Sequence, residues 1–481
     1  MDYEAVIGLE THVQLKTRSK MWCGCANGFG APPNTNVCPV CLGLPGVLPV
    51  ANDEALRLTA LTGLLLNCTI PPYAKFDRKN YFYPDMPKNY QITQYDKPST
   101  VNGYVDFEFE GNLARVRITR AHLEEDVGKN FHFERNSGVD FNRAGVPLME
   151  IVSEPDITSP SMAYEYLNAL KDILTYGLVS DCDMEKGMVR CDVNVSIRPR
   201  HQKELGAKIE IKNMNTFSGV RKALEYEIPR QIEVLKNGGK LIQSTRRWDD
   251  ATGTTEEMRT KEHAHDYRYF PEPDLMPFQP TEAWLEEVSR RVVELPLARK
   301  QRFMRDYQLP APDAQTFVWD VPLGTYFESI AKKAKNPKSV ANWVINNLRA
   351  KMTEAHTTLE DLKFKPAAIP DLIELVDGGK ISTRIAQEVF AEMFASGTAP
   401  GEIVAQKGLG QVSDTGAIEK FCDEAIAANP GPAADYKAGK AAALNFLKGQ
   451  VMKLSKGKAN PAVVGEILER KLKTRSVTNE A

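Results

Sequence analysis

Four cysteines within nineteen residues form the strongest local signal for chemistry in this chain: Cys23, Cys25, Cys38 and Cys41. Zinc takes four ligands at the corners of a tetrahedron, and two pairs of cysteines on tight turns supply them. Unbound thiols are the alternative, whereas disulfides are rare in a reducing compartment. Because four sulfur ligands leave no open position, the pattern predicts a structural zinc site in a zinc-ribbon-like insert over residues 23–41.

A histidine and several carboxylates form a second group that could bind a metal ion. Glu10 and His12 lie two apart in a segment where polar and apolar residues alternate, so both are expected on one face of a strand. Further candidates follow along the chain: Glu124, Glu125, Glu150, Asp192 and Glu210. Carboxylate oxygens favour a hard cation such as Mg²⁺, which often also holds nucleotide phosphates. Exposed carboxylates are common without a metal, so a solvated acidic surface remains the alternative, and a lone histidine is more often structural.

Two segments interleave aromatic and basic side chains, residues 76–91 and residues 265–274. Such segments can stack bases or clamp phosphates. The equally weighted alternative is a loop that its aromatic side chains pin to the core. The sequence contains neither of the two common glycine-rich phosphate loops. A bound nucleotide would therefore depend on a metal ion and on side-chain cations.

The elements expected to position these residues indicate an α+β fold. A period of two predicts strands around Glu10, Asp192 and Glu210 and a hairpin over residues 104–119. Such strands suit an antiparallel sheet with one dry and one polar face. Helical spacing predicts two helices in the same region, over residues 161–174 and 219–236.

The length of 481 residues suggests about three domains. Residues 269–280 are rich in proline and lack periodicity, which marks a boundary. Beyond them, the frequent Ala, Glu, Lys and Leu residues predict helices, with a second break near residues 398–401. The expected organisation is a sheet-rich domain, a helical domain and a small helical tail, over residues 1–280, 281–400 and 401–481.

Charge is nearly balanced, with 61 basic and 63 acidic residues, which excludes a strongly basic nucleic-acid binder at the level of the whole chain. Residues 437–475 differ, because they hold ten basic and only two acidic residues. This stretch could contact a phosphate backbone or form a solvated helical face. No apolar run is long enough for a transmembrane helix, and the N-terminus lacks the layout of a signal peptide, so the cytoplasm is the expected location.

Long motifs in the correct order resemble one known family, the B subunits of the aspartyl/glutamyl-tRNA amidotransferases. In the first 280 residues these are VIGLETHVQLKT, FDRKNYFYPDMPKNYQ, VDFNRAGVPLMEIVSEPDI, MEKGMVRCDVNVSIRP, KIEIKNMNTF and AHDYRYFPEPDL. The resemblance continues in the tail through FLKGQVMKLSKGKANP and so covers nearly the whole chain.

The resemblance implies a cradle-shaped catalytic domain, a helical domain and a tail related to the YqeY family. It implies a heterotrimer with an amidase, the A subunit, and a small C subunit. The substrates would be mischarged Glu-tRNA(Gln), Asp-tRNA(Asn) or both. The B subunit would use ATP and Mg²⁺ to phosphorylate the side-chain carboxylate, and ammonia from the amidase would then displace the phosphate. Phosphorylation is chemically reasonable, because it supplies the good leaving group that a carboxylate lacks.

The resemblance also implies site residues. The metal and kinase site of the family falls on Glu10, His12, Glu125, Glu150, Asp192 and Glu210, with Mg²⁺ expected at Glu10, His12, Glu125 and Glu150. Either Glu124 or Glu125 fits the motif at that point. Lys79 is expected to stabilise phosphate charge, and Arg190 and Lys212 are expected to contact the ATP phosphates. The four-cysteine site occurs in only part of the family, so zinc should not be essential to the reaction.

Two other classes of function remain as alternatives. A non-catalytic zinc-ribbon RNA-binding scaffold would predict a basic N-terminal half, which the charge balance opposes. A scaffold protein with a degenerate site would predict the loss of Glu10, His12 or Asp192, and all three are present.

Overall fold

The computed structural model describes residues 2–260, 267–410, 415–455 and 459–473. The chain divides into two compact units, residues 1–298 and residues 299–481, which are described separately below. Among the described helices, none combines the length and the apolar character needed to cross a bilayer.

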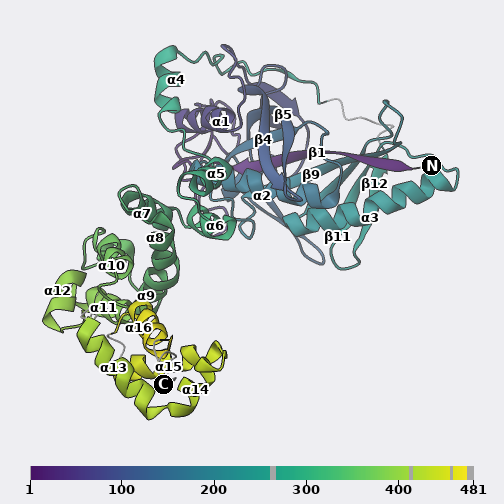
Figure 1. Cartoon of the computed structure of the whole chain (residues 1–481). Helices are drawn as coiled ribbons and strands as arrows, with labels where there is room; N and C mark the ends of the chain where they lie inside the picture. Colours follow the sequence, from purple (N-terminus) through teal and green to yellow (C-terminus); the bar gives the residue numbers. More distant parts are fainter. Residues whose placement is uncertain (1, 261–266, 411–414, 456–458, 474–481) are drawn as a thin grey trace, which may run out of the picture. The chain divides into compact units, whose positions relative to one another are not determined.

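An eight-stranded sheet forms the centre of the first unit (Figure 1). In spatial order its strands are β12 (Thr254–Thr260), β11 (Ser244–Asp249), β10 (Ile209–Met214), β9 (Val189–Pro199), β1 (Tyr3–Gln14), β8 (Pro147–Ser153), β5 (Asn112–Glu125) and β4 (Thr100–Phe109). The expected antiparallel sheet is confirmed except at one pair, β10 and β11, which run parallel. The long helix Phe217–Lys236 lies between these two strands in the sequence. It provides the crossover connection that a parallel pair requires.

Three helices cover one face of this sheet: α1 (Asp53–Leu65), α2 (Pro160–Tyr176) and α3 (Phe217–Lys236). The two helices expected in this region are thereby confirmed as α2 and α3. The helices bury the alternate apolar side chains of the strands, such as Ile7, Leu9, Val193 and Val195. The intervening polar side chains consequently share the opposite face.

The β4–β5 hairpin has a turn one residue earlier than expected from the sequence. Phe109 pairs with Asn112, so Glu110 and Gly111 form the turn, instead of Gly111 and Asn112. Both turn residues have positive φ, 49° and 77°, as a type I′ turn requires. The strands therefore continue to the turn without a bulge.

Two small sheets complete the first unit. One contains β13 (Phe270–Pro271), β2 (Asp77–Asn80) and β3 (Tyr90–Thr93), and the other contains β6 (Lys129–His132) and β7 (Ser137–Asp140). The first sheet joins the two aromatic and basic segments of the sequence, because Phe270 pairs with Arg78. His265 and Asp266 of the second segment lie outside the described residues. The unit also contains the short helices η1 (Phe141–Arg143) and α4 (Glu282–Ser289).

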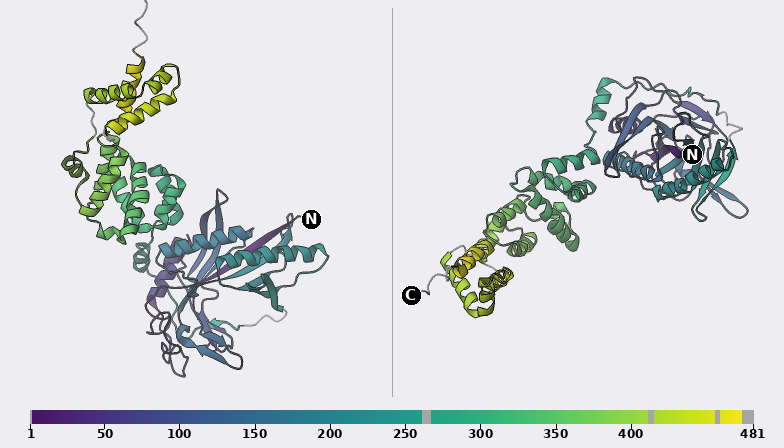
Figure 2. Two further views of the ribbon diagram at one scale, coloured as in Figure 1. Left: turned by 90° about the horizontal axis from the view of Figure 1, so that it is seen from below. Right: turned by 45° about the vertical axis from the view of Figure 1, so that its right-hand side comes forward.

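The second unit is built from helices (Figure 2). They are α5 (Pro296–Asp306, which begins at the end of the first unit), α6 (Ala311–Trp319), α7 (Val321–Ala331), α8 (Pro337–Trp343), η2 (Val344–Leu348), α9 (Arg349–Ala355), η3 (Leu359–Asp361), α10 (Ala368–Asp377), α11 (Thr383–Ser396), α12 (Pro400–Gln406), α13 (Thr415–Ala428), α14 (Pro430–Lys437), α15 (Ala442–Leu454) and α16 (Pro461–Lys473). They enclose two separate hydrophobic cores, one between Phe303 and Ile403 and one between Ile418 and Leu472. The helical character expected beyond residue 280 is therefore confirmed.

Candidate active site

The polar face of the large sheet gathers the acidic residues that the sequence singled out. In the strand register, Glu10 of β1 lies opposite Asp192 of β9, and His12 lies opposite Glu150 of β8. Glu150 in turn lies opposite His122 of β5. Because side chains alternate along each strand, these groups point to one side.

The first group on this face, called the His12 cluster below, contains His12, Glu124 and Glu150. Each residue offers a ligand atom, and these atoms lie within 4.8 Å of one another. His12 Nδ1 lies 3.1 Å from Glu124 Oε1, and Glu150 also lies 3.5 Å from His122 Nε2. The carboxylate oxygens at this spacing could hold a small hard cation, with the imidazole of His12 as a further ligand.

The electrostatics of the His12 cluster couple its members. Burial alone would lower the pKa of His12, but the hydrogen bond with Glu124 and the charges of Glu150 and Asp192 outweigh it and raise the pKa to about 9. The same contact lowers the pKa of Glu124 although burial opposes this. Burial lowers the pKa of the neighbouring His122 to about 3. Without a metal, His12 and Glu124 therefore form an ion pair at neutral pH, and His122 is neutral.

Lys79 approaches the His12 cluster from the small sheet that contains β2. Its Nζ lies 5.0 Å from the centre of the Tyr267 ring. Burial opposes the ammonium charge, but Glu124 and Glu150 favour it, and the pKa of Lys79 is raised. The ring of Tyr269 stacks on Tyr95 at 4.2 Å beside it. The aromatic and basic segments thus supply a cation next to the carboxylates.

The second group, called the Glu10 cluster below, contains Glu10, Asp192 and Glu210, whose ligand atoms also lie within 4.8 Å of one another. The ammonium of Lys212 lies 2.7 Å from Asp192 Oδ2 and 3.1 Å from Glu210 Oε1. Burial opposes this charge, but the two carboxylates raise the pKa of Lys212. Three acidic groups and one resident cation therefore occupy this part of the face.

Glu125, predicted as a metal ligand, points away from both clusters. It follows Glu124 on β5, and consecutive strand side chains face opposite sides. Its carboxylate holds the ammonium of Lys88 and accepts a 2.9 Å hydrogen bond from the backbone N–H of Ile92. Of the two alternatives that the motif left open, the geometry favours Glu124. Lys88 was missed by the sequence reasoning, although it lies in the aromatic and basic segment.

The two cations expected at the ATP phosphates are both engaged with carboxylates. Arg190 donates a 2.8 Å hydrogen bond from Nη2 to Asp126 Oδ1. Asp126 is buried and also accepts from Gln14 Nε2 at 2.9 Å. Asp126 thus fixes the Arg190 guanidinium near the edge of the His12 cluster, whereas Lys212 lies inside the Glu10 cluster.

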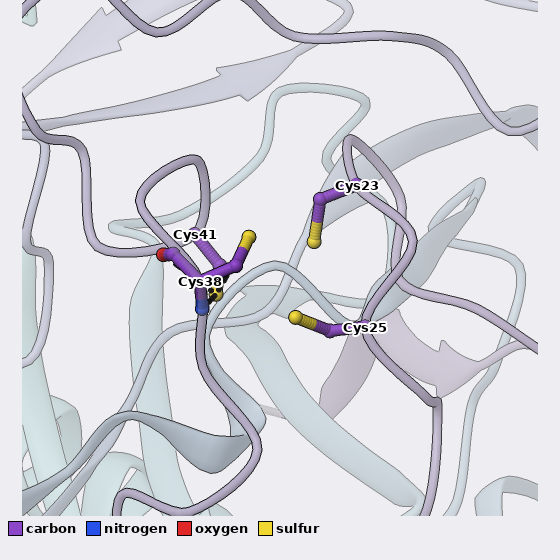
Figure 3. A group of neighbouring side chains, drawn as sticks. All are labelled: Cys23, Cys25, Cys38 and Cys41. Carbon is purple, nitrogen blue, oxygen red and sulfur yellow. Dashed lines mark hydrogen bonds between the residues drawn. The ribbon is translucent and has the colours of Figure 1, made fainter.

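The four cysteines lie together on two facing loops and point toward a common centre (Figure 3). Their sulfur atoms lie within 4.8 Å of one another, and Cys38 Sγ and Cys41 Sγ are 3.8 Å apart. A tetrahedron with Zn–S bonds of about 2.3 Å has edges of ~3.8 Å, so the spacing fits zinc. The backbone N–H of Cys38 donates to Cys41 Sγ at 3.0 Å. The hydrogen bond between Cys23 and Cys41 lowers the pKa of Cys41 and raises that of Cys23, so Cys41 is the more readily ionised thiol of this pair.

The cysteine loops are tied to the segment that precedes β8. The buried ammonium of Lys20 donates to the carbonyl oxygen of Asn36 at 3.0 Å. The N–H of Asn36 donates to the side chain of Asn142 at 2.8 Å, and the N–H of Asn34 donates to Asp140 at 2.9 Å. These contacts hold the loop at a fixed position on the first unit.

Part of the basic stretch in residues 437–475 is paired within the tail. Lys471 contacts Asp423 at 2.7 Å and Lys440 contacts Asp435 at 3.0 Å. Lys437 and Lys453 are exposed. Lys456, Lys458 and Arg475 lie outside the described residues. The positive surface that remains is smaller than the residue count suggests.

Comparison with known proteins matches both parts of the chain. Residues 5–286 match the GatB/GatE catalytic domain, and residues 325–472 match the GatB domain. The B subunit of the aspartyl/glutamyl-tRNA(Asn/Gln) amidotransferase of Carboxydothermus hydrogenoformans is 53% identical over 476 residues, which cover 98% of this chain and 99% of the relative. The corresponding protein of a Thermoanaerobacter species is 51% identical over 474 residues (98% and 100%), and that of Methylacidiphilum infernorum is 52% identical over 485 residues (98% and 99%).

Proposed function

The chain belongs to the B-subunit family of the aspartyl/glutamyl-tRNA(Asn/Gln) amidotransferases, and we propose that its polar sheet face carries the ATP-dependent step of the reaction. The substrates are misacylated Glu-tRNA(Gln), Asp-tRNA(Asn) or both. The observation that carries the proposal is the strand register, which brings the His12 cluster and the Glu10 cluster onto one face of one sheet. Such chemistry belongs in the cytoplasm, where aminoacyl-tRNA is used.

The reaction has two chemical steps. An oxygen of the side-chain carboxylate attacks the γ-phosphorus of ATP, and ADP leaves with the electrons of the broken P–O bond. Ammonia then adds to the carbonyl carbon of the acyl phosphate. Loss of inorganic phosphate and of a proton leaves the amide. Activation is needed because the carboxylate itself has no adequate leaving group.

The carboxylate oxygens of both clusters fit Mg²⁺, which prefers oxygen ligands. The imidazole nitrogen of His12 is a softer donor, of a kind more usual with transition metals. We assign His12, Glu124 and Glu150 as one set of ligands and Glu10, Asp192 and Glu210 as the other, with Glu124 in place of Glu125. A bound Mg²⁺ would offset negative charge where the substrate carboxylate meets the phosphates.

The cations of the face have separate roles in this proposal. Lys79, beside Glu124 and Glu150, stabilises the negative charge that develops on the transferred phosphoryl group. Arg190, fixed by Asp126, contacts the outer phosphates of ATP. Lys212, which contacts Asp192 and Glu210, is the second cation assigned to the ATP phosphates.

The proposal is tested by ADP formation that depends on mischarged tRNA in the assembled enzyme. Asp192→Ala should abolish this ADP formation, whereas glutamine hydrolysis by the amidase partner should continue. Tyr95→Phe offers a control outside both clusters, because it keeps the ring that stacks on Tyr269. Normal tRNA-dependent ADP formation by Asp192→Ala would contradict the assignment.

The partners in this proposal are an amidase, the A subunit, and a small C subunit, in a heterotrimer. The described cysteines lie in the four-cysteine site or are buried, as Cys68, Cys182, Cys191 and Cys422 are. A glutamine-hydrolysing nucleophile is therefore expected on the amidase, and the ammonia must reach the polar face from it.

The helical tail over residues 401–481 is assigned to tRNA binding. Exposed lysines such as Lys437 and Lys453 supply positive charge, and each neutralised phosphate releases a counterion. Lys437→Glu with Lys453→Glu should raise the KM for charged tRNA several-fold and weaken its dependence on salt. Glutamine hydrolysis should not change. Unaltered tRNA affinity and salt dependence in the double variant would reject this role.

The four cysteines are assigned to one structural zinc ion. The matching sulfur spacing supports this assignment. Because four thiolates complete the coordination of zinc, the site contributes stability and no catalytic step.

A further inference from the structure

Lys212 lies where a metal ion would lie in the Glu10 cluster. Its ammonium contacts two of the three carboxylates, Asp192 Oδ2 at 2.7 Å and Glu210 Oε1 at 3.1 Å, and so bridges two of the candidate ligands. Two other carboxylate oxygens of the cluster accept hydrogen bonds from neutral side chains. Thr245 Oγ1 donates to Glu210 Oε2 at 2.9 Å, and Asn194 Nδ2 donates to Glu10 Oε1 at 2.8 Å.

Strand β10 places Lys212 beside Glu210. Lys212 follows Glu210 by two residues, so both side chains face the same side of the strand. The pairing of β10 with β9 shifts its register between Ile211 and Met214, and this irregularity brackets Lys212 and Asn213. Asn213 at this irregularity has a positive φ of 73°, and its side chain donates to the carbonyl oxygen of Trp248 at 3.0 Å. Bulges next to active sites commonly redirect a side chain. The contact between Lys212 and the carboxylates is therefore built into the strand.

We propose that Lys212 is an internal counter-ion of the Glu10 cluster, which a divalent cation displaces and which then binds the phosphates of the incoming nucleotide. The inference rests on the proposed function. Without a metal, the ammonium offsets the charge of two of the three neighbouring carboxylates, Asp192 and Glu210. A divalent cation brings twice the charge to the same oxygens and so outcompetes it.

The freed side chain has a new partner available. Lysine carries its charge on a flexible stem of four methylene groups, and the Lys212 side chain is 38% exposed, so it can move without a change in the strand. Nucleotide phosphates held by the metal ion would lie next to it. The face would thus acquire its phosphate-binding cation only after the metal ion has entered.

Metal binding without nucleotide gives the first test. Mn²⁺ titration of the full assembly, followed by electron paramagnetic resonance, measures affinity independently of ATP and tRNA. Lys212→Met removes the competing charge and should strengthen Mn²⁺ binding at the Glu10 cluster about tenfold, because the lost ammonium is in direct contact with two of the ligand carboxylates. The same variant should bind ATP more weakly in the presence of the metal. Lys212→Arg should resemble the wild type.

Lys208→Met is the matched control. Lys208 approaches the same cluster, but only to 4.0 Å from Glu10 Oε1, and does not bridge two carboxylates. It should change Mn²⁺ affinity little. Mn²⁺ binding by Lys212→Met that equals or is weaker than that of the wild type would overturn the inference. In that case, loss of Mn²⁺ binding in His12→Ala would still support the proposed function.

Chemical labelling tests the wild-type chain, in case Lys212→Met does not fold. An amine held in two short contacts reacts slowly with an acetylating reagent, and mass spectrometry reports its modification relative to Lys208. Mg²⁺ alone should accelerate acetylation of Lys212 several-fold, and Mg²⁺ with ATP should suppress it again. Labelling of Lys212 that is unaffected by Mg²⁺ would contradict displacement.

Discussion

The cysteine loops and the polar sheet face both bring potential metal ligands within 4.8 Å of one another, but they do so in different ways. The four sulfur atoms come from nineteen consecutive residues on two turns. The ligands of the sheet face come from separate strands, so Glu10 meets Asp192 only because β1 pairs with β9.

The two regions also differ in how they balance charge without a metal. On the sheet face, the imidazolium of His12 and the ammonium groups of Lys79 and Lys212 offset the carboxylates. Such a face can exchange its own cations for a metal ion and a nucleotide. The sulfur site has a complete set of four ligands, which leaves no position for a substrate. The comparison therefore assigns chemistry to the sheet face and stability to the cysteine loops.

The largest expected effect distinguishes neighbouring glutamates of the sheet face. Glu124→Gln removes a proposed ligand and the partner of His12, so tRNA-dependent ADP formation should fall at least ~100-fold. Glu125→Gln breaks contacts with Lys88 and the backbone of Ile92 instead, so it should lower thermal stability and affect ADP formation less. The opposite order in the ADP assay would restore Glu125 as the ligand.

A smaller loss is expected from Lys79→Met. The Lys79 ammonium, near Glu124 and Glu150, should stabilise the charged phosphoryl group in the transition state by about 1.5–3 kcal/mol. Its loss in Lys79→Met should therefore lower the rate of phosphoryl transfer ~10- to 100-fold. Single-turnover ADP formation measures this rate. Lys79→Arg keeps the charge and should recover part of it. A Lys79→Met enzyme with the wild-type rate would show that the ammonium only offsets the negative charge of the neighbouring carboxylates and takes no part in phosphoryl transfer.

Substitutions in the cysteine loops should lower thermal stability but leave ADP formation nearly unchanged. Zinc at about one equivalent is expected in the purified protein, and Cys23→Ser with Cys38→Ser should remove it. The melting temperature should fall by several degrees, because metal binding contributes directly to folding stability. ADP formation at low temperature should change less than about twofold. A variant of full stability with lost turnover would place the loops in the reaction instead.

The smallest effect concerns the pH dependence of the metal-free sheet face. The raised pKa of His12, about 9, means that its ion pair with Glu124 stabilises the fold fully below the unfolded pKa of about 6.5. This contribution is lost as the pH rises through 9. In chelator, His12→Gln should therefore lower the melting temperature more at pH 6 than at pH 9.5. An equal loss at both values would show that the ion pair contributes little.

The sequence predicted most of the sheet face because alternation is a local property. Glu10 and His12 had to share a face, and so had Asp192 and Asn194, once their segments formed strands. Which strands become neighbours is a long-range property that no local pattern contains. The division into a His12 cluster and a Glu10 cluster therefore became visible only in the strand register.

The differences between prediction and structure have local causes as well. The choice between Glu124 and Glu125 depends on the exact phase of β5 with respect to the sheet, which the sequence motif leaves open. Helix α1 was not expected, although Asn52 caps it and accepts from the N–H groups of Glu54 and Ala55. Asn52, Asp53 and Glu54 before an apolar run are a helix start signal that could have revealed it.

The most direct test of the central claim supplies free ammonia in place of glutamine, together with ATP and mischarged tRNA. This assay bypasses the amidase partner, so it reports only activation of the carboxylate and its capture by ammonia. If the polar sheet face carries phosphoryl transfer, the His12→Ala assembly should form amidated tRNA at least ~100-fold more slowly than the wild type, with glutamine hydrolysis and tRNA binding retained. Formation of amidated tRNA at a near wild-type rate would show that His12 is structural and that activation takes place elsewhere.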